Sequence, residues 1–155
     1  MPRSYTITGN PASVASAANT ELLQGLATST GKFRLTRLEI GQITTQTLTG
    51  IVIQLNRYSA AFTAGSGGTA ITPAKLDSGD AAAVSTWLQL NTTKISGGTQ
   101  TVLRNHVMQD VVGMQEIPIP EDQAQFNASE ALQVLLVTAL GVTTNLAYIA
   151  SITEL

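Results

Sequence analysis

The stretch Ile51-Val52-Ile53-Gln54-Leu55-Asn56-Arg57-Tyr58 decides the fold class of this chain. Its apolar residues Ile51, Ile53 and Leu55 alternate with the polar Gln54 and Asn56. Successive side chains of a β-strand point to opposite faces of the sheet, so this period of two predicts a strand with one buried face and one wet face.

The rest of the chain favours strands as well, because Thr, Val and Ile are frequent and their stiff side chains fit a pleated sheet. In Lys32–Ile40 the apolar positions change parity between Leu35 and Leu38, and a one-residue bulge near Thr36 would restore one apolar face. About nine short strands are expected, at residues 5–8, 21–27, 32–40, 51–58, 86–90, 99–108, 111–117, 132–140 and 145–153. With 155 residues the chain is long enough for one domain. The sequence therefore predicts an all-β, single-domain antiparallel β-sandwich over residues 1–155.

Three segments need a separate interpretation. Residues 129–138 begin with good helix formers, but Val134, Val137 and Thr138 favour a strand that is buried on both faces. Residues 59–83 read as a long loop, and a loop of this length in a small domain usually has a function. Residues 1–8 are expected to form an N-terminal arm.

The charge content excludes several classes of protein. Only 12% of the residues are charged, the net charge is -2, and there is no cysteine. These values exclude a disordered acidic tail, a basic nucleic-acid binder and a disulfide scaffold.

The first residues contain no apolar core typical of a secretory signal, so we expect synthesis in the cytoplasm. Polar residues interrupt the charge-free stretch 131–153, and we expect neither a membrane nor nucleic acid as a partner.

Catalytic and metal-binding patterns are weak. His106 is the one histidine, and on an exposed or edge strand it has no neighbour that would make a serine-type nucleophile. Asp77 and Asp80 flank Gly79, but they lack the further oxygen ligands that a Ca²⁺ loop supplies. We therefore expect no enzyme, no catalytic residues, no cofactor and no metal.

Low charge combined with a β-sandwich points to assembly. Exposed strand edges recruit partners, and the lysines that would protect such edges are scarce here. We expect part of the surface to be covered by other chains, which favours a structural protein over an enzyme.

Three stretches carry a resemblance to a known family: residues 34–40, residues 53–57, and Thr69-Ala70-Ile71-Thr72-Pro73-Ala74-Lys75-Leu76-Asp77-Ser78-Gly79-Asp80-Ala81-Ala82. Together they resemble a family of small head proteins of tailed bacteriophages. Residues 18–20 and 117–121 sit where that family has similar residues, and the likeness covers most of the chain after Ala17. Its most specific piece is the Thr-Pro-x-x-Leu-Asp-x-x-Asp-Ala pattern in the third stretch.

The resemblance implies a capsid decoration, or cement, protein with a jelly-roll-like fold. Such a protein sits on the outside of the virion and bridges neighbouring copies of the major capsid protein, and a homotrimer at local three-fold positions is the favoured oligomer. The expected contacts are residues 1–5 of the arm and residues 60–83 of the loop, with Phe62 and Trp87 as apolar anchors; for Trp87 a position in the sandwich core is slightly favoured over the interface. The interface residues predicted in this way are Pro2, Arg3, Tyr5, Arg57, Phe62, Pro73, Leu76 and Trp87.

Two other classes remain open. A carbohydrate-binding or host-adhesion module would need a flat platform of exposed aromatic side chains. A cupin-like enzyme would need several histidines around a metal, which the single His106 does not supply.

Overall fold

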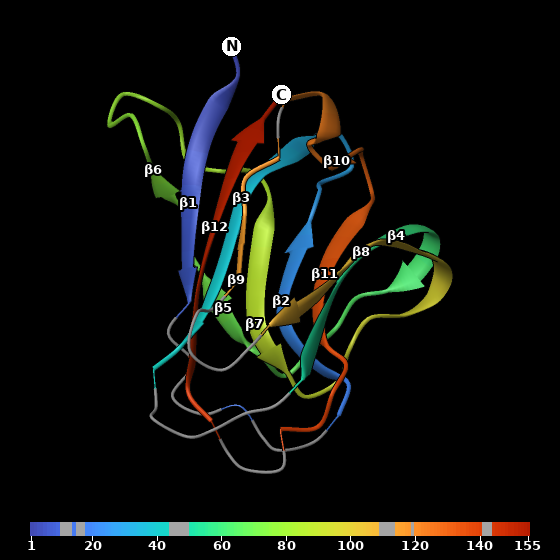
Figure 1. The fold of residues 1–155 in the computed structure, drawn as a ribbon. Coiled ribbons are helices and arrows are strands. Elements are labelled where there is room, and N and C mark those ends of the chain that lie inside the picture. The colour runs from blue at the N-terminus through green and yellow to red at the C-terminus, as the bar shows by residue number, and fades with distance from the viewer. Residues whose placement is uncertain (10–13, 15–17, 44–49, 109–113, 119, 141–143) are drawn as a thin grey trace.

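The computed structural model describes residues 1–9, 14, 18–43, 50–108, 114–118, 120–140 and 144–155. In this part of the chain two antiparallel sheets pack on each other as a sandwich (Figure 1). The other regular element in these ranges is a short 3-10 helix, η1 (Pro120–Asp122). The predicted all-β fold is confirmed.

Each sheet has six strands within the described residues. The first sheet contains, in spatial order, β10 (Gln125–Phe126), β3 (Phe33–Gln42), β12 (Leu146–Glu154), β1 (Arg3–Gly9) and β6 (Ala74–Lys75), and β9 (Met114–Glu116) also pairs with β3. The second sheet contains β5 (Thr69–Ile71), β7 (Thr86–Asn91), β2 (Thr20–Leu26), β11 (Ala131–Leu136), β4 (Ile51–Thr63) and β8 (Ser96–Met108).

The order of the strands is that of a jelly roll. Strands β1, β2, β3 and β4 alternate between the two sheets, and β8, β9, β11 and β12 return in the opposite sense. As a result β12 lies between β1 and β3, while β11 lies between β2 and β4. This double wrapping is the topology of the jelly-roll sandwich, so the predicted jelly-roll-like fold is confirmed. Residues 64–95, between β4 and β8, are an insertion that adds β5, β6 and β7 to the margins of the sheets.

All nine predicted strands occur, with ends that differ by a few residues. Residues 111–113 of the predicted strand 111–117 lie outside the described residues. Every residue of β11 is buried, which confirms a strand with two buried faces. Strands β5, β6 and β10 were not predicted, because two or three residues are too few to show a period.

The bulge expected near Thr36 is present. Ser151 of β12 lies opposite Arg37, and the next residue, Ile152, lies opposite Leu35, so Thr36 has no partner in the register. The extra residue lets both halves of β3 turn their apolar side chains inward. The Thr36 hydroxyl donates a hydrogen bond of 3.0 Å to the carbonyl of Ser151, which fixes the bulge.

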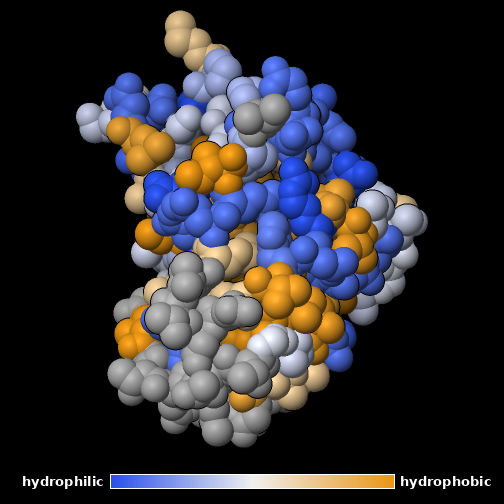
Figure 2. Space-filling view, viewed as in Figure 1, coloured by the Kyte–Doolittle hydropathy of each residue, from blue (hydrophilic) through white to orange (hydrophobic). Residues whose placement is uncertain are grey.

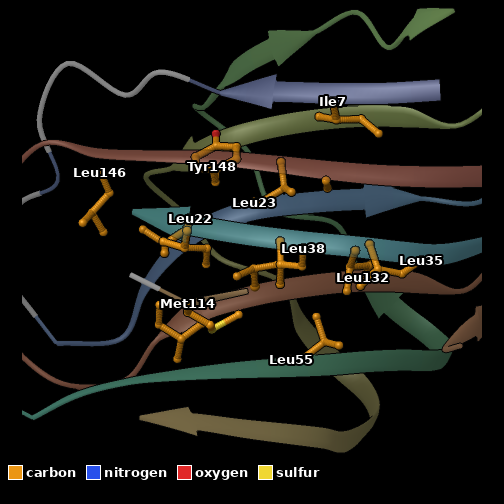
Figure 3. Packing of buried hydrophobic residues seen from close by; sticks show 14 of the residues in the cluster. Ile7, Leu22, Leu23, Leu35, Leu38, Leu55, Met114, Leu132, Leu146 and Tyr148 are labelled. Atoms are coloured by element: carbon orange, nitrogen blue, oxygen red, sulfur yellow. The ribbon is translucent and has the colours of Figure 1, made fainter. Parts of the chain in front are cut away.

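The main core fills the space between the sheets. Ile7 and Leu38 of the first sheet meet Leu55 and Leu132 of the second, and all four side chains are buried (Figure 3). Tyr148 closes the core on β12, and its hydroxyl donates a 2.6 Å hydrogen bond to Gln89 Oε1. Burial raises the pKa of the Tyr148 hydroxyl well above its ordinary value of 10.0.

Candidate interaction surfaces

The predicted N-terminal arm is wrong. Residues 3–9 form β1, which pairs with β12 along its whole length and with β6 on its other edge. The alternation of Tyr5 and Ile7 with polar residues places their side chains in the core, and core burial holds the strand in the sheet. Met1 and Pro2, which come before the strand, are both exposed.

Two predicted contact residues belong to the core. Tyr5 is fully buried, and its hydroxyl donates a 3.0 Å hydrogen bond to the carbonyl of Ala81. Trp87 is 2% exposed, because β7 joins the second sheet and turns this side chain inward. Its ring lies 5.3 Å from that of Phe33 between centroids, and its Nε1 donates to Ser85 Oγ at 3.0 Å. The prediction that Tyr5 is an interface residue is therefore wrong, and of the two positions considered for Trp87 the structure shows the sandwich core.

The predicted loop 59–83 is only partly a loop. Its first five residues end β4, and β5 and β6 lie within it. Pro73 is half-buried, whereas Leu76 is 65% exposed. The Leu76 amide donates to the carbonyl of Ser4 at 3.1 Å, so this segment lies along β1. The structure thus brings Leu76 and Pro73 to the margin of the first sheet on which Arg3 lies.

An open pocket of about 230 Å³ lies at the end of the sandwich where the two termini meet. We call five of the residues that line it the terminal patch: the half-buried Arg3 and the exposed Met1, Lys32, Val84 and Leu155. Glu154 also lines the pocket, but its carboxylate accepts hydrogen bonds from the amides of residues 84 and 85 and from the residue 85 hydroxyl. The terminal patch therefore combines apolar side chains with two cationic side chains.

The remaining predicted residues, Arg57 and Phe62, lie on the other sheet. Beyond residue 58, β4 continues with β8 as a two-stranded ribbon that curls away from the sandwich (Figure 1). Residues 59–63 and the facing residues 96–99 form this part, and residues 100–102 of β8 continue it beside residues 56–58; we call residues 59–63 and 96–102 together the ribbon. All of residues 96–102 are exposed, and neither segment contains a charged residue. Phe62 is half-buried, with its ring 6.4 Å from that of Tyr58. Arg57 is half-buried at the base of the ribbon.

Strand β8 is also the last strand of its sheet, so its outer edge has no strand partner among the described residues. Val102 and Val107 on this strand are 46% and 71% exposed. On the face shown in Figure 2, hydrophilic residues cover much of the upper half, with separate hydrophobic patches among them, and a larger hydrophobic group lies just below the middle. An edge strand whose exposed segment carries no charge and shows apolar side chains is a ready template for a strand of another chain.

The charged side chains of β8 turn the other way, toward the first sheet. Glu116 of β9 accepts from Arg104 Nε at 2.6 Å through Oε1, and its Oε2 lies 2.8 Å from His106 Nε2. This cluster joins the margins of the two sheets. No local pattern of residues predicts this cluster, because Glu116 reaches His106 only when β9 and β8 come together at the margins of the two sheets.

The insertion is held on the outer face of the second sheet by a buried polar cluster: Glu21 and Gln24 of β2, Asn56 of β4, Asn91 of β7 and Gln133 of β11. Glu21 Oε1 accepts from Asn91 Nδ2 and Oε2 from Gln133 Nε2, both at 2.5 Å, and Oε2 also accepts from the amide of Ile95 at 3.0 Å. Gln24 Oε1 accepts from the amide of Gly65 at 2.7 Å.

Beside the polar cluster, Tyr58, Ile95 and Ala131 form a small second core. Burial and, to a lesser extent, the charge of Glu21 raise the pKa of Tyr58 above its ordinary value. No local pattern predicts either feature, because both bring together residues of strands that are distant in the sequence.

In the described ranges no helix is long and apolar enough to cross a membrane. The same ranges hold no group of three or more His, Cys, Asp or Glu side chains that could bind a metal ion. All seven aromatic residues lie in the described ranges; six are buried and Phe62 is half-buried. The flat aromatic platform that an adhesion module would need is therefore not formed.

Comparisons with known proteins give little more. No family model matches the chain, and no curated protein matches it. Among solved structures it is similar to part of a chain described as the structure of infectious bursal disease virus Gx strain, at 18% identity and a TM-score of 0.23. The match covers 99% of this protein and 41% of that chain, so this protein spans less than half of its neighbour's length. A TM-score this low carries no argument about function.

Proposed function

We propose that this protein is a structural component of a virus particle, and more narrowly a decoration protein on the outside of a tailed-bacteriophage head. In this role it bridges neighbouring major capsid subunits and performs no catalysis. The sequence resemblance to small phage head proteins supports the proposal, and the jelly-roll fold is one that viral capsid proteins use. Fold alone does not define function, so the proposed role is inferred from the residues exposed on the surface.

The observation that carries the proposal is the ribbon with the free edge of β8. Residues 96–102 of β8 are seven consecutive exposed, uncharged residues. The backbone N–H and C=O groups on their outer edge pair with no strand among the described residues. A partner strand added there gains main-chain hydrogen bonds, while Val102 and Val107 offer apolar contacts on one face. The two ionic side chains of β8 do not protect this edge, because Glu116 holds both of them on the inner side.

The terminal patch supplies a second contact surface, and its residues are separate in the sequence from those of the ribbon. Two weak contacts on one molecule, multiplied in an oligomer, give avidity that neither contact provides alone. Because the assembled shell offers all of these contacts together, binding stabilises the shell by mass action. A homotrimer is the oligomer we favour, since it presents three ribbons and three terminal patches.

The test uses particles made with and without the gene for this chain. We expect the protein to co-purify with complete heads, and heads that lack it to release DNA at a lower temperature. Purified protein added back should restore heat resistance. A Val102→Lys variant should fail to bind, because it places a charge on the exposed edge strand.

Ser29→Lys is the matched control, since Ser29 is an exposed residue of the turn between β2 and β3. It adds the same charge and should bind heads as the unchanged protein does. Absence of the protein from complete heads would reject the virion role. If the protein is present in complete heads but heads that lack it resist heat equally well, the cementing role is rejected.

A further inference from the structure

We infer that residues 76–83 of one copy of this chain dock into the open pocket of a second copy, the pocket that the terminal patch lines. The contact joins an acidic segment to a pocket with cationic side chains. The inference rests on the homotrimer of the proposed function and names the contact between its copies. It is carried by the chemistry of the pocket, the chemistry of the segment, and the fixed position of the segment.

The first observation is that the pocket contains cations without an acidic partner. It has a volume of about 230 Å³ and lies at one end of the sandwich. Arg3 and Lys32 line it, and neither forms an ion pair among the described residues. Glu154 also lines it, but both carboxylate oxygens already accept hydrogen bonds from residues 84 and 85. An acidic group that enters from outside therefore finds two cations to pair with.

Apolar side chains line the rest of the pocket. Met1, Val84 and Leu155 supply them, and all three are exposed. An engineered apolar cavity of about 150 Å³ holds a benzene molecule, so this pocket is large enough for one leucine side chain. The pocket thus fits a group that presents an aliphatic side chain next to a carboxylate.

The second observation is that the chain itself contains a segment with this chemistry. Residues 76–83 include Asp77 and Asp80 and no basic residue, and Lys75 precedes them in β6. Neither aspartate forms an ion pair among the described residues. Leu76 is 65% exposed. An exposed leucine with two unpaired carboxylates beside it complements both the apolar walls and the cations of the pocket.

The third observation is that the segment has a fixed place outside its own pocket. The Leu76 amide donates to the carbonyl of Ser4 at 3.1 Å, so the segment begins on the margin of β1. Asp77 Oδ1 accepts from the amide of Gly79 at 2.9 Å, and the Asp77 carbonyl accepts from the amide of Asp80 at 3.1 Å. Residues 76–83 do not line the pocket of their own chain. A segment that is already ordered loses little conformational entropy when it docks on another copy.

The segment and the pocket are different surfaces, so the contact between copies is heterologous. A heterologous contact repeats from one copy to the next and closes into a ring when its rotation allows. The segment projects beside β1 at the end of the sandwich where both termini and the pocket lie (Figure 1). Copies joined at this end leave the ribbon, on the other sheet, available to the capsid.

The test measures self-association of the chain with Val102→Lys, which charges the edge of β8 and so removes association through the ribbon. In sedimentation velocity, association should be weaker in about 1 M than in about 0.1 M NaCl, because salt screens the paired charges. Asp80→Lys and Lys32→Glu should each weaken it on the order of 5-fold, since each brings like charges together. The chain with both substitutions should associate about as strongly as before, because the exchanged charges match again.

Glu121→Lys is the matched control for Asp80→Lys, and Lys94→Glu is the control for Lys32→Glu. Both control residues are exposed and lie outside the segment and the pocket, so these variants should associate like the Val102→Lys chain. If Asp80→Lys lowers the midpoint of thermal unfolding, Asp80→Asn replaces it and should weaken association by about 2-fold.

The inference is overturned if salt has no effect on association, or if the chain with both substitutions associates no better than either single variant. It is also overturned if Lys32→Glu weakens binding to heads but not self-association, because the pocket then holds an acidic segment of the capsid. Binding of the Val102→Lys chain to heads tests the ribbon separately, so the failure of one contact is distinguished from the failure of the other.

Discussion

At the scale of single residues, a few positions depend on atoms that arrive from distant segments. Gly65 faces the polar cluster, and Gly25 faces the ring of Trp87, so close that no side chain fits at either position. Glycine at such places permits close approach of the backbone. Gly41 differs, because a Cβ atom built there would meet nothing within 4 Å.

Gly65→Ala should therefore lower the free energy of unfolding by about 1–3 kcal/mol, the usual cost of forcing an added methyl group into a packed site. Urea unfolding followed by tryptophan fluorescence measures it. Gly41→Ala is the control and should change the free energy by less than about 0.5 kcal/mol. Equal stability of the two variants would show that the loop moves freely over the cluster.

Tyr148 makes stability depend on alkaline pH. Its hydroxyl has a raised pKa in the folded protein, whereas in the unfolded chain it ionises near 10. Its contribution is complete below pH 10 and is lost as the pH rises above that value, because only the unfolded chain then gains from ionisation. The free energy of unfolding should fall above pH 10, and it should fall less steeply in Tyr148→Phe.

The Tyr148→Phe variant should also be weaker by about 1 kcal/mol at pH 7, from loss of the hydrogen bond to Gln89. Urea unfolding at pH 7, 9, 10 and 11 separates the two effects. If the free energy of unfolding fell equally steeply above pH 10 in the variant and in the unchanged protein, the pH effect would not come from Tyr148.

At the scale of elements, a bulge adjusts the register of one strand, and a cluster around one carboxylate joins the margins of the two sheets. The bulge at Thr36 keeps both halves of β3 facing the core. At the open side of the sandwich, Glu116 of β9 holds Arg104 and His106 of β8. This cluster fixes the inner side of β8 and leaves the outer edge free.

Glu116→Gln should lower the free energy of unfolding by about 1–2 kcal/mol, between the values for exposed and buried ion pairs. Glu39→Gln is the comparison, because the Arg37–Glu39 pair is more exposed, at 44% and 23% for the two side chains. It should cost less than about 0.5 kcal/mol. A double-mutant cycle with Arg104→Ala and Glu116→Gln isolates the pair, and a coupling energy near zero would refute the role of the cluster.

At the scale of the whole molecule, the jelly roll leaves the outer edge of β8 open among the described residues, and residues 96–102 of this edge carry no charge. We expect the purified chain to self-associate at high concentration, and Val102→Lys to shift it toward the monomer. Sedimentation velocity over a range of concentrations measures this, with Ser29→Lys as the control. A monomer at every concentration would remove the support for an oligomer.

The sequence alone determined the all-β class, the nine main strands, the bulge in β3 and the doubly buried β11. These features follow from side-chain periodicity and β-branching, which act between neighbours in the chain. Only the tertiary structure decided the positions of Tyr5 and Trp87, the place of residues 3–9 inside a sheet, and the meeting of Glu21 with Asn91 and Gln133. Each of these depends on which strands pair, and pairing is set by long-range burial that no local pattern records.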